Sequence, residues 1–283
     1  LYLFEMPIQF ADLGSKTRDL LTKKYDYKTD FKAVTKSKEN NVKIEAGASG
    51  RAVEGYMKLF YKNKAWGKLE TEVHSNVEHG DKVKIKLNKF ADKTSVTLSA
   101  SSLAAVGLNA QYAKDKFAAD LTLLHCEKNT NAAVSATANY KDVTVGALAD
   151  FEAPNGTVVL KDANVGAEFN YKKMTATVKT ANLRNEVALS VFHKLDKQLR
   201  WGSSLVVRPN ESFSPIVALG LDYKLGGGAS FKAKGDNSGN VAVAVQHQLK
   251  EPALRFNVAA EYNIAKLCCQ PARQFGFSVV YGD

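Results

Sequence analysis

The stretch Arg273-Gln274-Phe275-Gly276-Phe277-Ser278-Val279-Val280-Tyr281 decides the fold. Successive side chains of an extended strand point to opposite faces, so its residues divide into two sets. The large apolar set is Phe275, Phe277, Val279 and Tyr281, and the opposite set is Gln274, Gly276, Ser278 and Val280. Such a strand needs a hydrogen-bonded neighbour at each edge and an apolar surrounding for its large face. A closed β-barrel in a lipid bilayer supplies both.

The same period of two holds from residue 25 to the end of the chain. Val83, Ile85 and Leu87, for example, alternate with lysines. Short turn signals such as Lys141-Asp142 separate roughly nineteen segments of about ten residues, the length that a tilted strand needs to cross a bilayer. Tyrosines recur near segment ends, as in the aromatic girdles of membrane barrels: Tyr25, Tyr61, Tyr112, Tyr140, Tyr171, Tyr223, Tyr262 and Tyr281. The pattern predicts an all-β transmembrane barrel of about 19 strands.

Composition agrees with a barrel that holds water. The 283 residues include 39 Lys+Arg against 29 Asp+Glu, a net charge of +10. The basic residues are spread along the alternating segments rather than gathered in one arm, which argues against a nucleic-acid partner and favours small anions. The mean hydropathy of −0.25 resembles that of a soluble protein. A barrel that is apolar on one face only has the same average, and no run of apolar residues is long enough for a spanning helix.

Residues 10 to 23 form the one convincing helix in the sequence. Its apolar stripe at helical spacing comprises Phe10, Leu13, Thr17, Leu20 and Leu21. Charged residues lie mainly off that stripe. The pattern predicts an amphipathic helix with one face packed against the rest of the protein.

Catalytic and metal-binding patterns are absent from the sequence. The five histidines are scattered, and no nucleophile or carboxylate stands at motif spacing from them. Three cysteines give neither a disulfide framework nor metal-ligand spacing. Gly226-Gly227-Gly228 lacks the Lys and the following helix of a phosphate loop. We therefore predict no enzyme activity, no cofactor and no metal site.

Both ends of the chain resemble one family. Gln274, Gly276, Val279 and Tyr281 match the polar-x-Gly-x-x-hydrophobic-x-hydrophobic signal that ends mitochondrial outer-membrane barrels. The N-terminal match is Pro7, Phe10, Ala11, Asp12, Leu13, Gly14, Arg18, Asp19, Leu20, Leu21, Thr22, Lys23 and Tyr25. The chain thus resembles the mitochondrial voltage-dependent anion channels, the eukaryotic porins. That family is known for nineteen strands, so the estimate of strand number is not independent of the resemblance.

The resemblance implies a specific architecture. An N-terminal segment over residues 1 to 24 would carry a helix inside the pore, and residues 25 to 283 would form the barrel, with its first and last strands parallel. Leu13 and the rest of the apolar stripe would rest on inward apolar side chains, while Lys16, Arg18, Asp19 and Lys23 would belong to the charged side of the pore helix, at the narrowest passage. The location implied is the mitochondrial outer membrane, with membrane lipid around the barrel.

Two departures from the family pattern affect these expectations. The glycine-rich hinge that usually follows the helix is replaced by Lys24-Tyr25-Asp26-Tyr27, which brings helix motion into question. Glu72 matches the position of a lipid-facing glutamate in some members. Alternation instead places Glu72 on the polar face, because Leu69, Thr71 and Val73 occupy the apolar one.

The polar face of the segments would line the pore. Its predicted basic residues include Lys28, Lys32, Lys58, Lys82, Lys84, Lys86, Arg200, Lys232 and Lys234. Inward acids are fewer, so the lumen should attract anions. Screening over about 8 Å at physiological salt makes the preference mild. We therefore expect a voltage-dependent, weakly anion-selective channel for inorganic ions and for metabolites such as ATP, ADP and phosphate.

Three alternatives stay open on the sequence alone. A related outer-membrane barrel could act as a protein-import pore, although that family has a longer N-terminal region and a more acidic interior. The barrel could also be a scaffold or subunit of a larger mitochondrial assembly, and a homo-oligomer is equally compatible with the pattern. The third alternative is a soluble lipid-binding β protein, which would hide its apolar faces in a dry centre.

Overall fold

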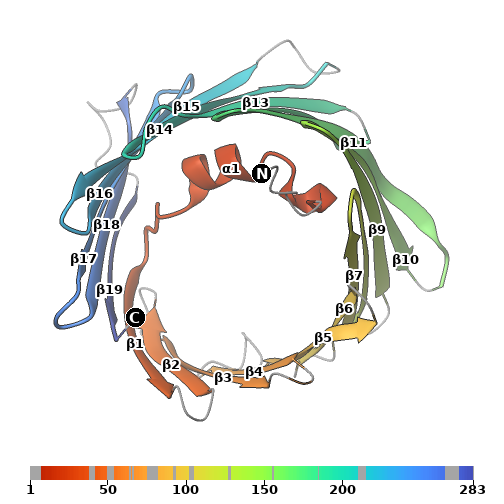
Figure 1. Ribbon diagram of the computed structural model, residues 1–283, viewed down its shortest axis with the longest axis horizontal. Coiled ribbons are helices and arrows are strands. Elements are labelled where there is room, and N and C mark those ends of the chain that lie inside the picture. The colour runs from red at the N-terminus through yellow and green to blue at the C-terminus, as the bar shows by residue number, and fades with distance from the viewer. Residues whose placement is uncertain are drawn as a thin grey trace.

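A computed structural model describes residues 8–37, 42–49, 54–63, 65, 67–74, 82–91, 94–101, 105–126, 129–154, 156–183, 185–209, 215–264 and 274–282, with the side chains of 49, 54 and 88–91 left out. Pro7 of the N-terminal match lies outside these residues. The described chain forms a single closed barrel around an open centre (Figure 1). Among the described residues, no helix is long and apolar enough to cross a membrane.

Nineteen strands make up the barrel wall. They are β1 Thr29–Ser37, β2 Val42–Ser49, β3 Glu54–Asn63, β4 Gly67–His74, β5 Lys82–Ala91, β6 Thr94–Ser101, β7 Ala105–Lys114, β8 Phe117–Cys126, β9 Asn129–Tyr140, β10 Val143–Pro154, β11 Val159–Tyr171, β12 Met174–Ala181, β13 Glu186–Lys194, β14 Leu199–Val207, β15 Ile216–Gly226, β16 Ala229–Asp236, β17 Asn240–Leu249, β18 Leu254–Asn263 and β19 Gln274–Tyr281. Each pairs antiparallel with the next, and β1 and β19 close the ring in parallel from Thr29↔Phe277 to Ala33↔Tyr281. The predicted fold class and its parallel closure are confirmed.

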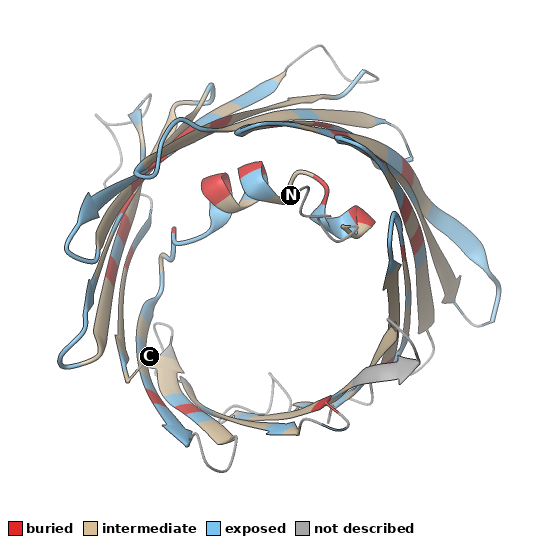
Figure 2. Ribbon diagram, viewed as in Figure 1, coloured by how far each residue is buried: buried red, intermediate tan, exposed pale blue. Residues whose placement is uncertain are grey.

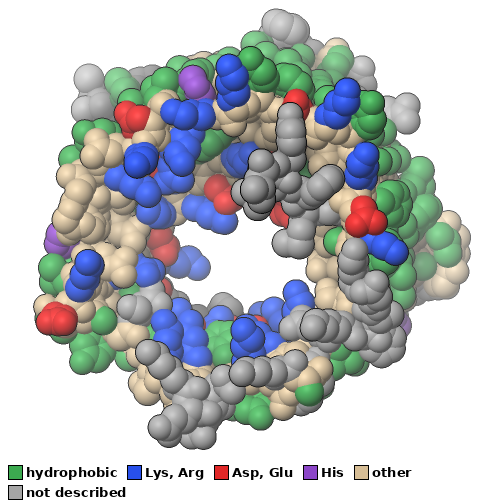
Figure 3. Space-filling view, viewed as in Figure 1, with side chains coloured by type: hydrophobic (Ala, Val, Ile, Leu, Met, Phe, Trp, Pro, Cys, Tyr) green, Lys and Arg blue, Asp and Glu red, His purple; other side chains and the backbone are tan. Residues whose placement is uncertain are grey.

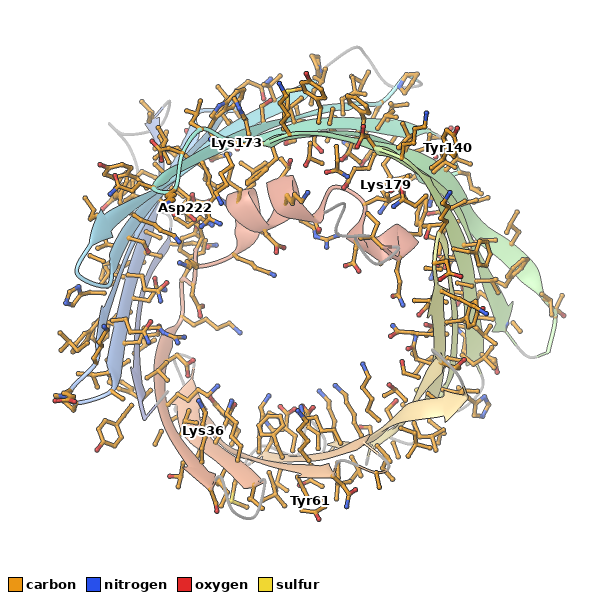
Figure 4. All side chains as sticks on the ribbon, viewed as in Figure 1. Lys36, Tyr61, Tyr140, Lys173, Lys179 and Asp222 are labelled. Atoms are coloured by element: carbon orange, nitrogen blue, oxygen red, sulfur yellow. The ribbon has the colours of Figure 1, made fainter. Side chains whose placement is uncertain are left out.

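The outer surface is apolar, as the alternation predicts. Phe275 is 62% exposed, Val106 59% and Leu219 57%, and the barrel carries many such residues on its outside. Tyr61 and Tyr140 lie on the outer side of the wall in Figure 4. Large apolar side chains around the whole circumference require an apolar solvent. The soluble alternative is wrong, because these side chains do not fill a dry centre.

The N-terminal segment lies inside the barrel and is divided into two helical pieces. A 3-10 helix, Phe10–Asp12, is followed by Gly14 with a φ of 72°, and then by α1, Ser15–Thr22. The continuous helix predicted over residues 10 to 23 is therefore wrong at its first turn. Gly14 lets the chain change direction there, because a left-handed conformation strains residues that carry a Cβ.

Candidate pore and its lining

The predicted apolar stripe of the N-terminal segment is buried against the inner wall. Relative exposure is 1% for Phe10, 2% for Leu13, 3% for Thr17, 4% for Leu20 and 9% for Leu21. Figure 2 shows the buried surface of α1 turned toward the wall, away from the open centre. The wall side of this contact includes β9 and β10 near Phe10–Asp12 and β13 to β15 near α1.

The inner wall meets these side chains with glycines rather than with the apolar side chains that we expected. A Cβ on Gly220 would lie 2.7 Å from Leu21 Cδ2, and one on Gly202 would lie 3.0 Å from Leu20 Cδ2. Gly166 beneath Leu13 and Gly146 beneath Phe10 are similarly close. Gly202 pairs with Gly220 across β14 and β15. We call these four residues, Gly146, Gly166, Gly202 and Gly220, the glycine seat. The missing side chains of the glycine seat make room for the apolar stripe.

Two buried charges of the wall hold the ends of α1. The Gly14 N–H donates to Glu168 Oε2 over 2.8 Å, and the Glu168 side chain is only 4% exposed. At the other end Lys232 Nζ donates to the Asp19 and Lys23 carbonyl oxygens over 3.1 and 2.8 Å. A carboxylate at the helix N-terminus and an ammonium at its C-terminus both complement the helix dipole.

Lys232 is consequently not a water-facing charge of the pore. It is 3% exposed, because α1 and the residues after it cover it. The prediction that it lines the water-filled lumen is wrong. Lys179 has a similar position at the start of the segment, where its Nζ lies 4.5 Å from the centroid of the Phe10 ring (Figure 4).

The segment between α1 and β1 also lies inside the barrel. Tyr25 is 7% exposed and packs against the inward Ala242, Ala244 and Ala259. Burial raises the pKa of its hydroxyl, and the negative charge of Asp222 adds to that rise. The prediction that Tyr25 begins the alternating wall and joins a lipid-facing girdle is therefore wrong. The first strand begins at Thr29.

Gly276 of β19 lies directly beneath this segment. A Cβ at Gly276 would overlap the carbonyl oxygen of Asp26 and the Cα of Tyr27. Both obstacles are backbone atoms, which cannot rotate away. Close approach of one backbone to another is a common reason for glycine within a strand. Among the residues of the C-terminal match, Gly276 thus has a packing role inside the described barrel.

The charged side chains of the pore helix face the open centre, and most of them are hydrogen-bonded to neighbouring groups. Lys16 Nζ donates to Asn170 Oδ1 and Thr175 Oγ1 over 2.9 and 3.0 Å. Arg18 donates to the Ala11 carbonyl oxygen and ties α1 to the preceding turn. Lys23 and Asp19 form an ion pair of 2.6 Å. Only Asp19 and Lys23 neutralise each other, whereas Lys16 and Arg18 are bonded to uncharged acceptors and keep their positive charge.

The wall opposite α1 is more basic. Alternation places Lys82, Lys84 and Lys86 of β5 on the inner face beside β4, and no ion pair holds any of the three within the described residues. Lys32 bonds to Glu45 over 2.6 Å, Lys58 to Glu72 over 2.8 Å and Arg200 to Asp222 over 2.7 Å. Glu72 thus lies inward, as the alternation predicts. Figure 3 shows Lys and Arg side chains around the opening.

The remaining predicted charges have mixed surroundings. Lys28 is exposed in the segment before β1. Lys234 lies on the inner face of β16 with its Nζ 4.6 Å from the centroid of the Tyr25 ring. Lys32, Lys58 and Arg200 therefore line the wall as half of an ion pair, and Lys234 lines it as a partner of the N-terminal segment.

The chain is similar to known proteins over nearly its whole length. The model of the family described as eukaryotic porin matches residues 6–276. The chain belongs to the eukaryotic porin family. It is 22% identical to mitochondrial outer membrane protein porin 6 of Oryza sativa subsp. japonica, over 96% of this chain and 97% of the relative. It is 23% identical to mitochondrial outer membrane protein porin of 34 kDa of Solanum tuberosum, over 90% and 91%.

These relatives confirm the family and the location in the mitochondrial outer membrane that the resemblance implied. A solved mutant porin of Rh. blastica covers 84% of this chain and 93% of its own at 8% identity. The TM-score of this match is 0.47. Membership of the eukaryotic porin family makes the protein a membrane channel for metabolites, and such porins are channels rather than enzymes.

The C-terminal match of this eukaryotic porin places its residues on both faces of β19. Tyr281 is 57% exposed on the outer face, and Val279 lies on the same face. Gln274 and Gly276 lie on the inner face. This arrangement is compatible with an insertion signal, whose role stays a prediction.

Sequence reasoning missed Glu168 and the role of Lys232 in this porin. Both look like ordinary inward residues of alternating strands. A weak signal exists in the two glycines at Gly202 and Gly220, since an inward glycine on each of two neighbouring strands suggests that another backbone or side chain approaches there.

Proposed function

We propose that this barrel is a weakly anion-selective, voltage-dependent channel that lets inorganic ions, phosphate, ATP and ADP cross the mitochondrial outer membrane. The observation that carries the proposal is the uncompensated charge of Lys82, Lys84 and Lys86 on the open wall. A wide water-filled lumen bordered by such charges raises the local anion concentration and lowers that of cations. Because screening acts over about 8 Å, the preference should be mild.

Voltage dependence is supported by the same charges. A transmembrane potential acts with about 2.3 kcal/mol per elementary charge per 100 mV on charge that moves across the whole membrane. A rearrangement that shifts several wall or helix charges through part of the field would therefore respond to voltage. The charges available inside the lumen include the wall lysines and those of α1.

The experiment is a recording from purified full-length protein in planar bilayers. We expect large conductance, a reversal potential in a KCl gradient that indicates chloride preference, and lower conductance at high voltage of either sign. Cation preference would contradict the assignment of the inner wall. Little conductance together with stoichiometric copurifying partners would favour the scaffold alternative instead.

A further inference from the structure

An aromatic ring stands among lysines on the inner wall, across the open centre from α1. Phe60 of β3 pairs with Lys43 of β2 and with Glu70 of β4, which places it on the inner face. Its ring lies 4.2 Å from Lys68 Nζ and 5.2 Å from Lys43 Nζ. A large apolar ring on the polar face of the barrel departs from the alternation that governs the wall, so it calls for an explanation.

Lysines next to Phe60 form a row across three strands. Lys62 pairs with Lys68, and Lys68 pairs with Lys86; the one carboxylate bonded to this row is Glu70, on Lys68. Like charges directly opposite each other on neighbouring strands repel, and a bound anion relieves that repulsion. Strands lie about 4.8 Å apart, so one chain of linked phosphates can reach adjacent lysines of the row.

Each nearby acid is held in an ion pair by a neighbouring lysine, and Lys68 of the row is one of these lysines. Glu70 accepts from Lys68 over 3.2 Å, and Glu72 accepts from Lys58 over 2.8 Å and from His74. Glu45 is held by Lys32 and Lys43. Within the described residues, Lys62, Lys84 and Lys86 form no ion pair; Glu70, which lies opposite Lys84 in the register, is held by Lys68. Positive charge is therefore available beside the ring after the local ion pairs are counted.

We propose that Phe60, with Lys62, Lys68 and Lys86, forms a weak subsite for nucleoside phosphates on the pore wall. The base would stack on the Phe60 ring, which is a sequence-tolerant contact because every base has a π-face. The Lys68 ammonium would exchange its contacts with the ring and with Glu70 for the phosphates, which Lys62 and Lys86 would also contact. Weak binding suits a channel, since a passing solute must also leave. This subsite rests on the proposed channel function and specifies how one class of cargo meets the wall.

The test compares ATP with inorganic tripolyphosphate as probes of full-length channels in planar bilayers. Both anions carry linked phosphates, but only ATP carries a base. We expect ATP to reduce the KCl current at lower concentration than tripolyphosphate does. Phe60→Leu should raise the half-blocking concentration of ATP by about fivefold, toward that of tripolyphosphate. Lys62→Gln with Lys86→Gln should weaken block by both anions.

Two control variants distinguish loss of the aromatic ring from general damage to the channel. Phe117→Leu removes a ring from the outer face of β8, where Phe117 is 46% exposed, and should leave the difference between ATP and tripolyphosphate intact. Phe60→Trp keeps a stacking surface and should keep or strengthen ATP block. If Phe60→Leu fails to form channels, Phe60→Ser and Phe60→Trp serve instead. The subsite is overturned if Phe60→Ser still prefers ATP over tripolyphosphate to the wild-type extent and Phe60→Trp shows no stronger block by ATP.

The outcomes distinguish this subsite from the channel itself. Equal ATP block in wild type and Phe60→Leu overturns the subsite while the channel remains. Absent conductance or cation preference in the wild-type protein overturns the proposed function, irrespective of Phe60.

Discussion

Gly276 lies where the segment before β1 crosses the inner face of β19. Because the obstacles to a side chain there are backbone atoms of residues 26 and 27, Gly276→Ala should lift that segment from the wall. Overpacking of this kind costs about 1–3 kcal/mol. We expect faster tryptic cleavage after Lys23, Lys24 or Lys28 in protein refolded in detergent micelles, together with a lower unfolding temperature.

Gly235→Ala is the matched control for Gly276→Ala. Gly235 also lies within a strand, and its nearest neighbours, Asn240 O and Val241 Cγ2, would be 3.7 Å from an added Cβ. It should behave like wild type. A Gly276→Ala protein that is normal after refolding and defective only when imported by mitochondria would assign this glycine to insertion rather than to packing.

Lys232 fixes the C-terminal end of α1 through two carbonyl oxygens. Lys232→Met keeps the aliphatic length of the side chain and removes both hydrogen bonds. Bonds from charged donors contribute about 1.5–3 kcal/mol, so thermal unfolding in micelles should begin at a lower temperature. Lys224→Met on neighbouring β15, where the side chain is exposed, should change stability far less. Equal losses in the two variants would show that Lys232 is not a cap.

At the scale of elements, the helix and the open wall differ in how much charge they present. Asp19 and Lys23 of the helix neutralise each other, whereas Lys84 and Lys86 of β5 form no ion pair with a described acid, although Lys84 lies opposite Glu70 in the register. Asp19→Asn with Lys23→Gln leaves the net charge unchanged, so the reversal potential in a KCl gradient should barely move. Lys84→Gln with Lys86→Gln removes two positive charges and should shift it toward zero. A larger shift in reversal potential from the helix variant than from the wall variant would mean that the helix determines the ion selectivity.

The strands of the wall could be predicted because each of them alternates apolar and polar side chains. Val83 and Lys84 lie on opposite faces of the wall both in the sequence pattern and in the structure. The turns are formed by polar residues such as Lys141 and Asp142. Alternation tells which side a residue faces, but not what covers it there. Lys84 and Lys232 therefore look alike in sequence, although one borders water and the other is buried under α1.

The N-terminal segment shows the same limit. Its apolar stripe from Phe10 to Leu21 was predictable from helical spacing, and all five residues are buried. The break at Gly14 and the glycine seat could not be predicted, because they depend on contacts with strands more than a hundred residues away. Glu168 receives the Gly14 N–H across such a separation. No local pattern encodes that partner.

At the scale of the whole molecule, an odd number of strands requires one parallel pair to close the ring. The β1–β19 pair spans only the register from Thr29 to Ala33. Removing residues 274 to 283 deletes β19 and exposes the edges of both β1 and β18. We expect that this variant gives no stable conductance in planar bilayers and aggregates in detergent.

Removing residues 1 to 24 is the matched deletion. The described part of that segment, residues 8–24, contributes no strand to the wall, so the barrel should still close and conduct. Stable channels from the variant that lacks residues 274 to 283 would mean that β18 and β1 can join directly. Loss of conductance in both deletions would mean that the N-terminal segment is needed for closure as well.

The crossing of residues 26 and 27 over Gly276 has a consequence for the order of assembly. The last strand, which closes the barrel, also supplies the surface on which residues 26 and 27 rest. The amino-terminal segment therefore cannot reach its final position until the first and last strands have paired. If the barrel closed with the amino-terminal segment outside, that segment would have to enter afterwards through one of the two openings of the barrel. We therefore expect closure of the barrel and docking of the amino-terminal segment to occur together.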